Sequence, residues 1–343
     1  MSTTLAPWWR VTTPHPKIAD TKVRLTEDTF AADLSTVVSR PERDLEYGEP
    51  ERFFGLTYLT EELKSLLSEV LGRLAGRGGQ SVIQVQTNFG GGKTHALIAL
   101  YHLMKNRKDC GELTNVLEVL QEGDLPEIPK AKCAVIVGTE YSMQEGRKVN
   151  GIRVRTLWGD LAVQLLSKKG YEIVQEDDSR RTAPGKVKLT EILDAAGPTL
   201  ILIDELMEYM ARAVGVKVHK ADLHGQTLAF LQELTEAVKA HPNACMVATL
   251  PASHREVYEE HAEDAFERLK RVFMRIESIR TPVDAARSEE IYEILRRRLL
   301  NQEMPVAPSE VERTVDAFYT VSYTHLRAHE TSLHLVCRLL LEK

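Results

Sequence analysis

The chain has few cysteines and no long apolar run. Its 343 residues include four cysteines, none of them in a CxxC pair. Cys133 and Cys245 lie inside apolar segments, where a small buried thiol is expected. No uninterrupted apolar stretch approaches the ~20 residues of a membrane-spanning helix, and the N-terminus lacks a basic region followed by an apolar core. We therefore expect no disulfide, no zinc site, no membrane contact and a cytoplasmic location.

The chain also lacks an excess of positive charge. Its 44 lysines and arginines face 50 aspartates and glutamates, which gives a net charge of −6. The bulk charge therefore gives no indication of nucleic-acid binding, although a local basic face is compatible with this total. With 43% hydrophobic and 27% charged residues, the composition is that of a globular protein about two domains long.

A glycine-rich segment between an expected strand and an expected helix is the most informative feature. The strand is residues 81–86, the loop TNFGGGKT covers 87–94, and the apolar run HALIALYHL follows. Glycines allow backbone N–H groups to surround a phosphate chain, and the next helix adds its positive dipole end. The predicted ATP-binding residues are Thr87, Asn88, Phe89, Gly90, Gly91, Gly92, Lys93, Thr94 and His95.

Two residues of this loop have specific predicted roles. Lys93 can neutralise the β- and γ-phosphate oxygens, and Thr94 can ligate Mg²⁺. One position departs from the common pattern, because GxxxxGK[ST] would place glycine where this chain has Thr87. The entry to the loop must therefore differ from the common form.

A second motif, TLILIDE at residues 199–205, follows about a hundred residues later. Four large apolar residues predict a strand buried on both faces, and its end delivers Asp204 and Glu205 to the carboxyl edge of a parallel sheet. Phosphate loops lie at the same edge. Asp204 is predicted to hold the Mg²⁺ shell, and Glu205 is predicted to polarise the attacking water.

Further candidates follow other expected strands and helices. Thr249 ends the apolar run ACMVATL, where a hydroxyl either senses the γ-phosphate or satisfies a loop backbone group. Arg268 and Arg271, with Arg275 behind them, either reach the nucleotide of a neighbouring subunit or form a solvated basic helix end. Tyr58 precedes a helix expected from residue 60 onward, and it either contacts adenine or packs in the core.

The pattern along the chain predicts an α/β fold, with the parallel sheet of a P-loop NTPase of the AAA+ or ASCE kind flanked by helices. We expect an N-terminal arm over residues 1–50, the ATPase core over 51–282 and the start of a helical lid over 283–320. Residues 171–188 are polar and are expected to leave the core fold. Residues 321–343 resemble a translated sequencing adapter and are expected to have no evolved role.

Several segments together resemble one family. They are PWWRVTTPHP, FFGLTYLTEELKSLL, QTNFGGGKTHALIALYHL, RTLWGDLAVQLL, TAPGKVKL and LILIDELMEYM. These look like the large prokaryotic AAA+-like ATPases of the PglY and BrxC kind, long catalogued as a domain of unknown function and often found in phage-defence islands. The resemblance implies an N-terminal ATPase fragment that assembles through its core, with other defence-system proteins as partners and foreign DNA as the eventual target.

Two other function classes stay open. One is a DNA translocase or helicase, which stimulation of ATP turnover by DNA would favour. The other is a scaffold that binds ATP without hydrolysing it, which Lys93 and Glu205 together argue against. The sequence has no NKxD element for guanine, and a small-molecule kinase would not need a second carboxylate at Glu205.

Overall fold

The computed structural model describes residues 13–15, 19, 31–87, 92–218, 221–251, 278–282 and 288–300. By its contacts the chain divides into a larger unit, Glu27–Ile294, and a smaller unit formed by Met1–Thr26 and Leu295–Lys343. In the described part of the smaller unit, Pro14 and Leu300 form an antiparallel bridge. The larger unit contains the central sheet.

The sheet has five parallel strands in the order β2-β5-β8-β1-β9. Their bounds are β1 (Val82–Thr87), β2 (Lys132–Val137), β5 (Thr199–Asp204), β8 (Ala244–Pro251) and β9 (Ser278–Arg280). Because all the strands run the same way, their carboxyl ends meet at one edge. β8 lies between β1 and β5, so one strand separates the two strands that lead into the predicted phosphate motifs.

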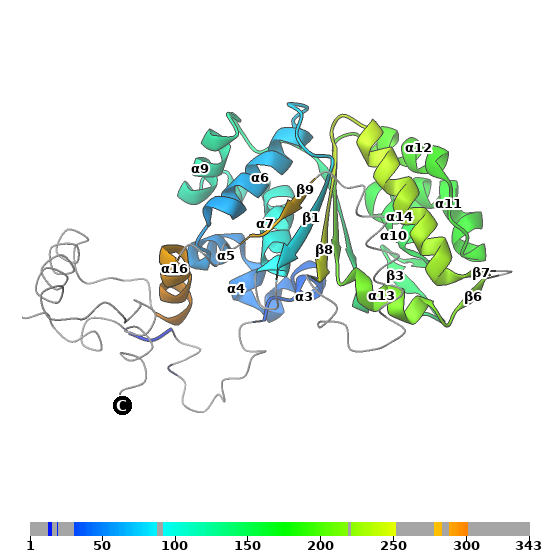
Figure 1. Ribbon diagram of the computed structural model, residues 1–343, viewed down its shortest axis with the longest axis horizontal. Helices are drawn as coiled ribbons and strands as arrows, with labels where there is room; N and C mark the ends of the chain where they lie inside the picture. The colour runs from blue at the N-terminus through cyan, green and yellow to red at the C-terminus, as the bar shows by residue number, and fades with distance from the viewer. Residues whose placement is uncertain are drawn as a thin grey trace, which may run out of the picture. The chain divides into compact units, whose positions relative to one another are not determined.

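Helices cover both faces of the sheet (Figure 1). The apolar side chains of β5 alternate between two cores: Leu200 and Leu202 belong to one, and Ile201 and Ile203 belong to the other. Such continuous apolar strands are typical of parallel sheets buried on both faces. Helices of the first core include α6 (Glu61–Leu74), α7 (Lys93–Lys105) and α9 (Thr114–Glu122); the second core includes α10 (Leu157–Leu166), α12 (Lys186–Ala196), α13 (Leu206–Ala213) and α14 (Leu223–Ala240).

Shorter elements connect these layers. They are α3 (Leu34–Ser39), η2 (Pro41–Arg43), α4 (Leu45–Gly48), α5 (Pro50–Leu56), α8 (Arg107–Cys110), η3 (Gly138–Glu140), β3 (Arg147–Val149), β4 (Ile152–Val154), α11 (Lys168–Arg180), β6 (Lys217–Val218), β7 (Ala221–Asp222) and α16 (Ser288–Leu299). This architecture confirms the predicted fold class: a parallel sheet flanked by helices, as in P-loop NTPases. Burial raises the pKa values of Cys133 and Cys245 to about 12, which fits their predicted place inside strands.

The expectation that residues 171–188 leave the core fold is wrong. Most of this segment is α11, which packs against α10, and Val174 is fully buried. The carboxylate of Asp178 accepts hydrogen bonds from the backbone N–H of Arg155 (3.0 Å) and the hydroxyl of Thr156 (2.6 Å). A polar segment can join the core in this way because its buried carboxylate is paired with donors from the residues before α10.

His102 joins α7 to the segment before it. Its Nε2 lies 2.7 Å from the carbonyl oxygen of Tyr47, so Nε2 must carry a proton and donate it. The amide nitrogen of Asn106 lies 2.9 Å from Nδ1, which then accepts. Both ring nitrogens of the neutral imidazole are therefore satisfied, and burial lowers the pKa of His102 below its usual value.

This lowered pKa predicts acid sensitivity of folding. Below about pH 6.5 the unfolded chain binds a proton at His102 that the folded chain does not, so the free energy of unfolding falls as the pH falls, by at most about 1.4 kcal/mol per unit. Urea titrations of wild type and His102→Gln over this range measure the effect. The variant should show the flatter dependence, because all other titrating groups are shared. Parallel curves for the two proteins would contradict the prediction.

Candidate functional site

The glycine-rich loop begins at the end of β1 and leads into the first turn of α7. Thr87 is the last residue of β1, whereas Asn88, Phe89, Gly90 and Gly91 lie outside the described residues. Gly92 precedes α7 with a φ of 81°, a left-handed conformation that glycine adopts without steric cost. α7 then starts at Lys93, so Lys93 and Thr94 lie at the positive end of the helix dipole.

Asp204, at the end of β5, is joined to this first turn. Asp204 is 4% exposed, and its carboxylate is hydrogen-bonded by the side chain of Thr94. The Thr249 hydroxyl of β8 donates to Asp204 Oδ1 at 2.5 Å, which is the contact that the strand order makes available. Burial raises the pKa of Asp204, and these hydrogen bonds and the charge of Lys93 oppose that rise. Lys93, Thr94 and Asp204, which are distant in the sequence, therefore converge at one sheet edge.

Glu205 follows Asp204 in a strained conformation. Its φ of 52° is left-handed, which is uncommon for a residue with a side chain. The hydroxyl of Thr139 donates to Glu205 Oε2 at 2.7 Å. Incomplete hydration raises the pKa of Glu205, and the carboxylates of Asp204, Asp33 and Glu208 raise it further. Glu205 is thus held beside Asp204 by a hydroxyl from the neighbouring strand end.

The segment after β2 supplies the residues that the sequence interpretation missed. A Cβ on Gly138 would lie 2.0 Å from the carbonyl oxygen of Glu205, so this close approach requires glycine. Arg212 of α13 donates to the carbonyl oxygens of Gly138 (2.5 Å) and Tyr141 (3.1 Å). The motif VIVGTE ends at the same sheet edge as LILIDE, and that position is the signal by which Thr139 could have been found.

His95 lies on the side of α7 that contacts α5 and the residues after it. The Thr57 hydroxyl donates to the Phe53 carbonyl oxygen and lies 2.9 Å from His95 Nε2. The His95 ring lies 4.6 Å from the Phe53 ring, centroid to centroid. Tyr58 is half-buried beside these residues in the chain. The α5 segment is therefore tied directly to the first turn of the phosphate-loop helix.

Three of the predicted site residues are arginines. Arg268, Arg271 and Arg275 lie outside the described residues.

Within the described ranges, no group of three His, Cys, Asp or Glu side chains is arranged to hold a metal ion. A metal held here would need hydroxyl, phosphate or water oxygens beside Asp204.

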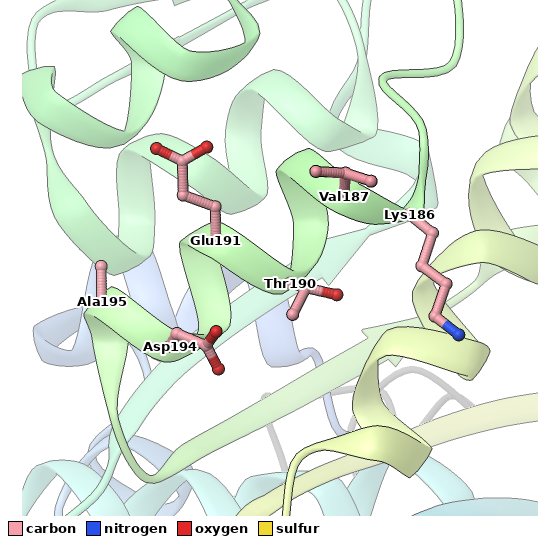
Figure 2. A pocket seen from close by; sticks show the side chains of 6 residues that line it. All are labelled: Lys186, Val187, Thr190, Glu191, Asp194 and Ala195. Atoms are coloured by element: carbon pink, nitrogen blue, oxygen red, sulfur yellow. The ribbon is translucent and has the colours of Figure 1, made fainter.

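The structure has a hollow on the outer side of α12, away from these motifs (Figure 2). It measures about 610 Å³ and is lined by Lys186, Val187, Thr190, Glu191, Asp194 and Ala195. None of the predicted site residues lines it. All six lining residues come from one helix, so this is an open surface groove. We therefore place the candidate site at the sheet edge and not in this groove.

Comparisons with known proteins give one family and one distant structural likeness. No curated protein matches the chain. Among solved structures it is similar to the structure of C. elegans PCH-2, with 12% identity and a TM-score of 0.29 over 68% of this chain and 46% of that one. The chain spans less than half of that structure's length, and a likeness at this TM-score carries no functional argument. Within the described residues, no helix is both long and apolar enough to cross a bilayer.

A family model described as the DUF499 N-terminal domain matches residues 16–287, which is most of the chain. The matched range includes the glycine-rich loop, Asp204, Glu205 and Thr139. The chain belongs to the DUF499 N-terminal domain family.

Proposed function

We propose that this chain is an ATP-binding and ATP-hydrolysing module that works with Mg²⁺. The observation that supports it is the convergence of Lys93, Thr94 and Asp204, with Glu205 beside them, at the carboxyl edge of a parallel sheet. In open α/β sheets this edge is where ligands bind. A backbone turn with a left-handed glycine at Gly92 leads into the helix end that would face the phosphates.

The oxygen donors fit Mg²⁺. Asp204 is a buried carboxylate whose pKa is raised by burial, and a divalent cation beside it would favour the charged form. Thr94 offers a hydroxyl on the other side, and Mg²⁺ commonly takes one or two protein oxygens together with phosphate and water. When bound, the ion would neutralise charge on the β- and γ-phosphates. Thr249 keeps the Asp204 carboxylate oriented through its 2.5 Å hydrogen bond.

Glu205 is proposed as the residue that orients and polarises the attacking water. Its neighbours Asp204, Asp33 and Glu208 are acidic and favour uptake of a proton from that water. Thr139 occupies one oxygen, Oε2, and leaves Oε1 for the water. This division of labour gives the two adjacent carboxylates different roles.

Thr139 provides a test of that arrangement. Thr139→Val keeps the side-chain volume and removes the hydroxyl, so turnover should fall about fivefold, the equivalent of one hydrogen bond. ATP affinity should be unchanged, because the hydrogen bond of the Thr139 side chain goes to Glu205 and not to the phosphate-loop helix. Thr139→Ser should retain wild-type turnover. Equal turnover in Thr139→Val and wild type would remove Thr139 from the mechanism.

The wider role follows from the resemblance to PglY and BrxC proteins. We propose a cytoplasmic oligomer formed through the ATPase core, with Arg268 or Arg271 reaching the nucleotide of the next subunit, inside a larger phage-defence assembly. A DNA translocase and a non-hydrolysing scaffold are the alternatives. Mixing an Arg268→Ala, Arg271→Ala protein with a Lys93→Ala protein tests the shared site, since restored turnover requires residues from two subunits.

The central test is steady-state ATP turnover with and without Mg²⁺. Turnover that EDTA abolishes and Mg²⁺ restores supports the proposal. ATP binding without turnover in any assembly would instead support the scaffold. Turnover that rises strongly with DNA would favour the translocase.

A further inference from the structure

A small β-hairpin, formed by β3 and β4, is the next pair of elements after η3, whose Thr139 contacts Glu205. β3 and β4 pair antiparallel, with Val149 opposite Ile152. The two residues of the turn, Asn150 and Gly151, have φ values of 46° and 84°, the positive values of a type I′ turn. The hairpin is therefore a well-defined element with a fixed register.

The outward side of this hairpin brings like charges together. Lys148 lies directly opposite Arg153 in the ladder, and both are exposed. Arg155 is also exposed and shares the Arg153 side, because buried Val154 lies between them. Like charges in directly opposed positions destabilise a ladder. We call Lys148, Arg153 and Arg155 the basic hairpin face.

Acidic side chains neutralise this face only in part. Arg153 forms an ion pair of 3.6 Å with Glu145 and donates to the Glu145 carbonyl oxygen at 3.0 Å. Neither Lys148 nor Arg155 forms an ion pair with another residue of the described ranges. In a chain of net charge −6, this concentration of cations is a local exception.

We propose that the basic hairpin face binds the phosphodiester backbone of a nucleic acid. A row of phosphates needs only closely spaced cations, and such contacts are independent of sequence. A protein partner would be expected to need an apolar centre from which charges are depleted. None of the large apolar side chains exposed in the described chain lies on the hairpin. The charge pattern therefore favours phosphates over an acidic protein surface.

The hairpin is connected to the catalytic carboxylate. Arg147 of β3 pairs with the buried carboxylate of Asp160 at 3.3 Å, and Asp160 also accepts a hydrogen bond from Tyr141. Tyr141 follows η3, whose Thr139 holds Glu205. We infer that nucleic acid bound to the hairpin influences the water-orienting residue through these paired side chains and the backbone between Tyr141 and Thr139. This second part of the inference rests on the proposed ATPase function, whereas binding itself does not.

Fluorescence anisotropy with labelled mixed-sequence DNA, single- and double-stranded, tests the binding in the absence of nucleotide. Lys148→Gln combined with Arg155→Gln should weaken binding about tenfold or more. It should also reduce the slope of log K against log salt by about 1.4 for single-stranded and about 1.8 for double-stranded DNA, the loss of two phosphate contacts. The matched control is Lys108→Gln with Lys132→Gln, which removes two exposed lysines elsewhere. This control should bind DNA as wild type does.

Three outcomes would overturn the proposal. They are absence of DNA binding by the wild type, equal loss in both double variants, and binding of labelled polyglutamate in preference to DNA. Lys148→Glu should raise the unfolding midpoint while weakening DNA binding, because it relieves the repulsion with Arg153. If the midpoint of Lys148→Glu falls instead, its loss of DNA binding reflects misfolding. The Lys148→Gln, Arg155→Gln variant then tests the proposal.

ATP turnover tests the connection separately. DNA should stimulate turnover of wild type and of the control, and the hairpin variant should keep basal turnover and lose the stimulation. Stimulation that survives in the hairpin variant would refute the connection. A protein that binds DNA through the hairpin but never hydrolyses ATP would refute the ATPase proposal alone.

Discussion

Lys93→Ala is expected to cause a large loss of ATP affinity. Lys93 begins α7, and its charge lies close enough to Asp204 to affect the pKa of that carboxylate. A triphosphate at this helix end would lose its charge-assisted hydrogen bond, which is worth about 2–3 kcal/mol and corresponds to about a 100-fold loss of affinity. Titration with a fluorescent ATP analogue measures the loss.

The control for this variant lies at the other end of the same helix. Lys105 is the exposed last residue of α7, so Lys105→Ala removes an equal charge without touching the phosphate-loop end. It should bind ATP as the wild type does. Unchanged affinity in Lys93→Ala would show that the side chain does not face phosphates, and the site would have to be sought elsewhere.

Glu205→Gln is expected to keep ATP binding and lose about 10²- to 10⁴-fold in turnover, the usual contribution of a general base. The amide is of the same size and can still accept the hydrogen bond from Thr139, so the geometry of the segment should persist. What is lost is the ability to accept a proton. Steady-state phosphate release and ATP affinity are measured on the same preparation.

Glu208→Gln is the matched control for this second variant. Glu208 lies one turn further along on α13, is exposed, and adds its charge to the surroundings of Glu205. Its loss should change turnover only modestly. If Glu205→Gln and Glu208→Gln had the same turnover, Glu205 would have no specific role in hydrolysis. The non-hydrolysing scaffold would then be the better account of the function.

Local pattern was sufficient for the main elements. The run LILID predicted β5, and the apolar pattern from residue 60 onward predicted α6, because both signals lie within one element. The excursion expected at residues 171–188 was wrong for the opposite reason. Asp178 there looks solvated, but it is buried and accepts hydrogen bonds from Thr156 and the backbone of Arg155, which lie more than twenty positions earlier.

The site shows the same division. The sequence indicated Lys93, Thr94, Asp204 and Glu205, because glycine-rich turns and strand-end carboxylates are short-range patterns. It did not indicate Thr139, because the contact between η3 and the turn after β5 depends on which strand lies beside β5. The neighbour relation of β2 and β5 creates that contact.

By itself, the sequence determined which segments form strands and helices and which side chains can bear charge at the strand ends. The tertiary structure alone decided that β8 lies between β1 and β5 and that Thr249 therefore holds Asp204. The physical reason is separation along the chain. Propensity and apolar period act within a few residues, whereas strand order is set by the packing of whole elements against two cores.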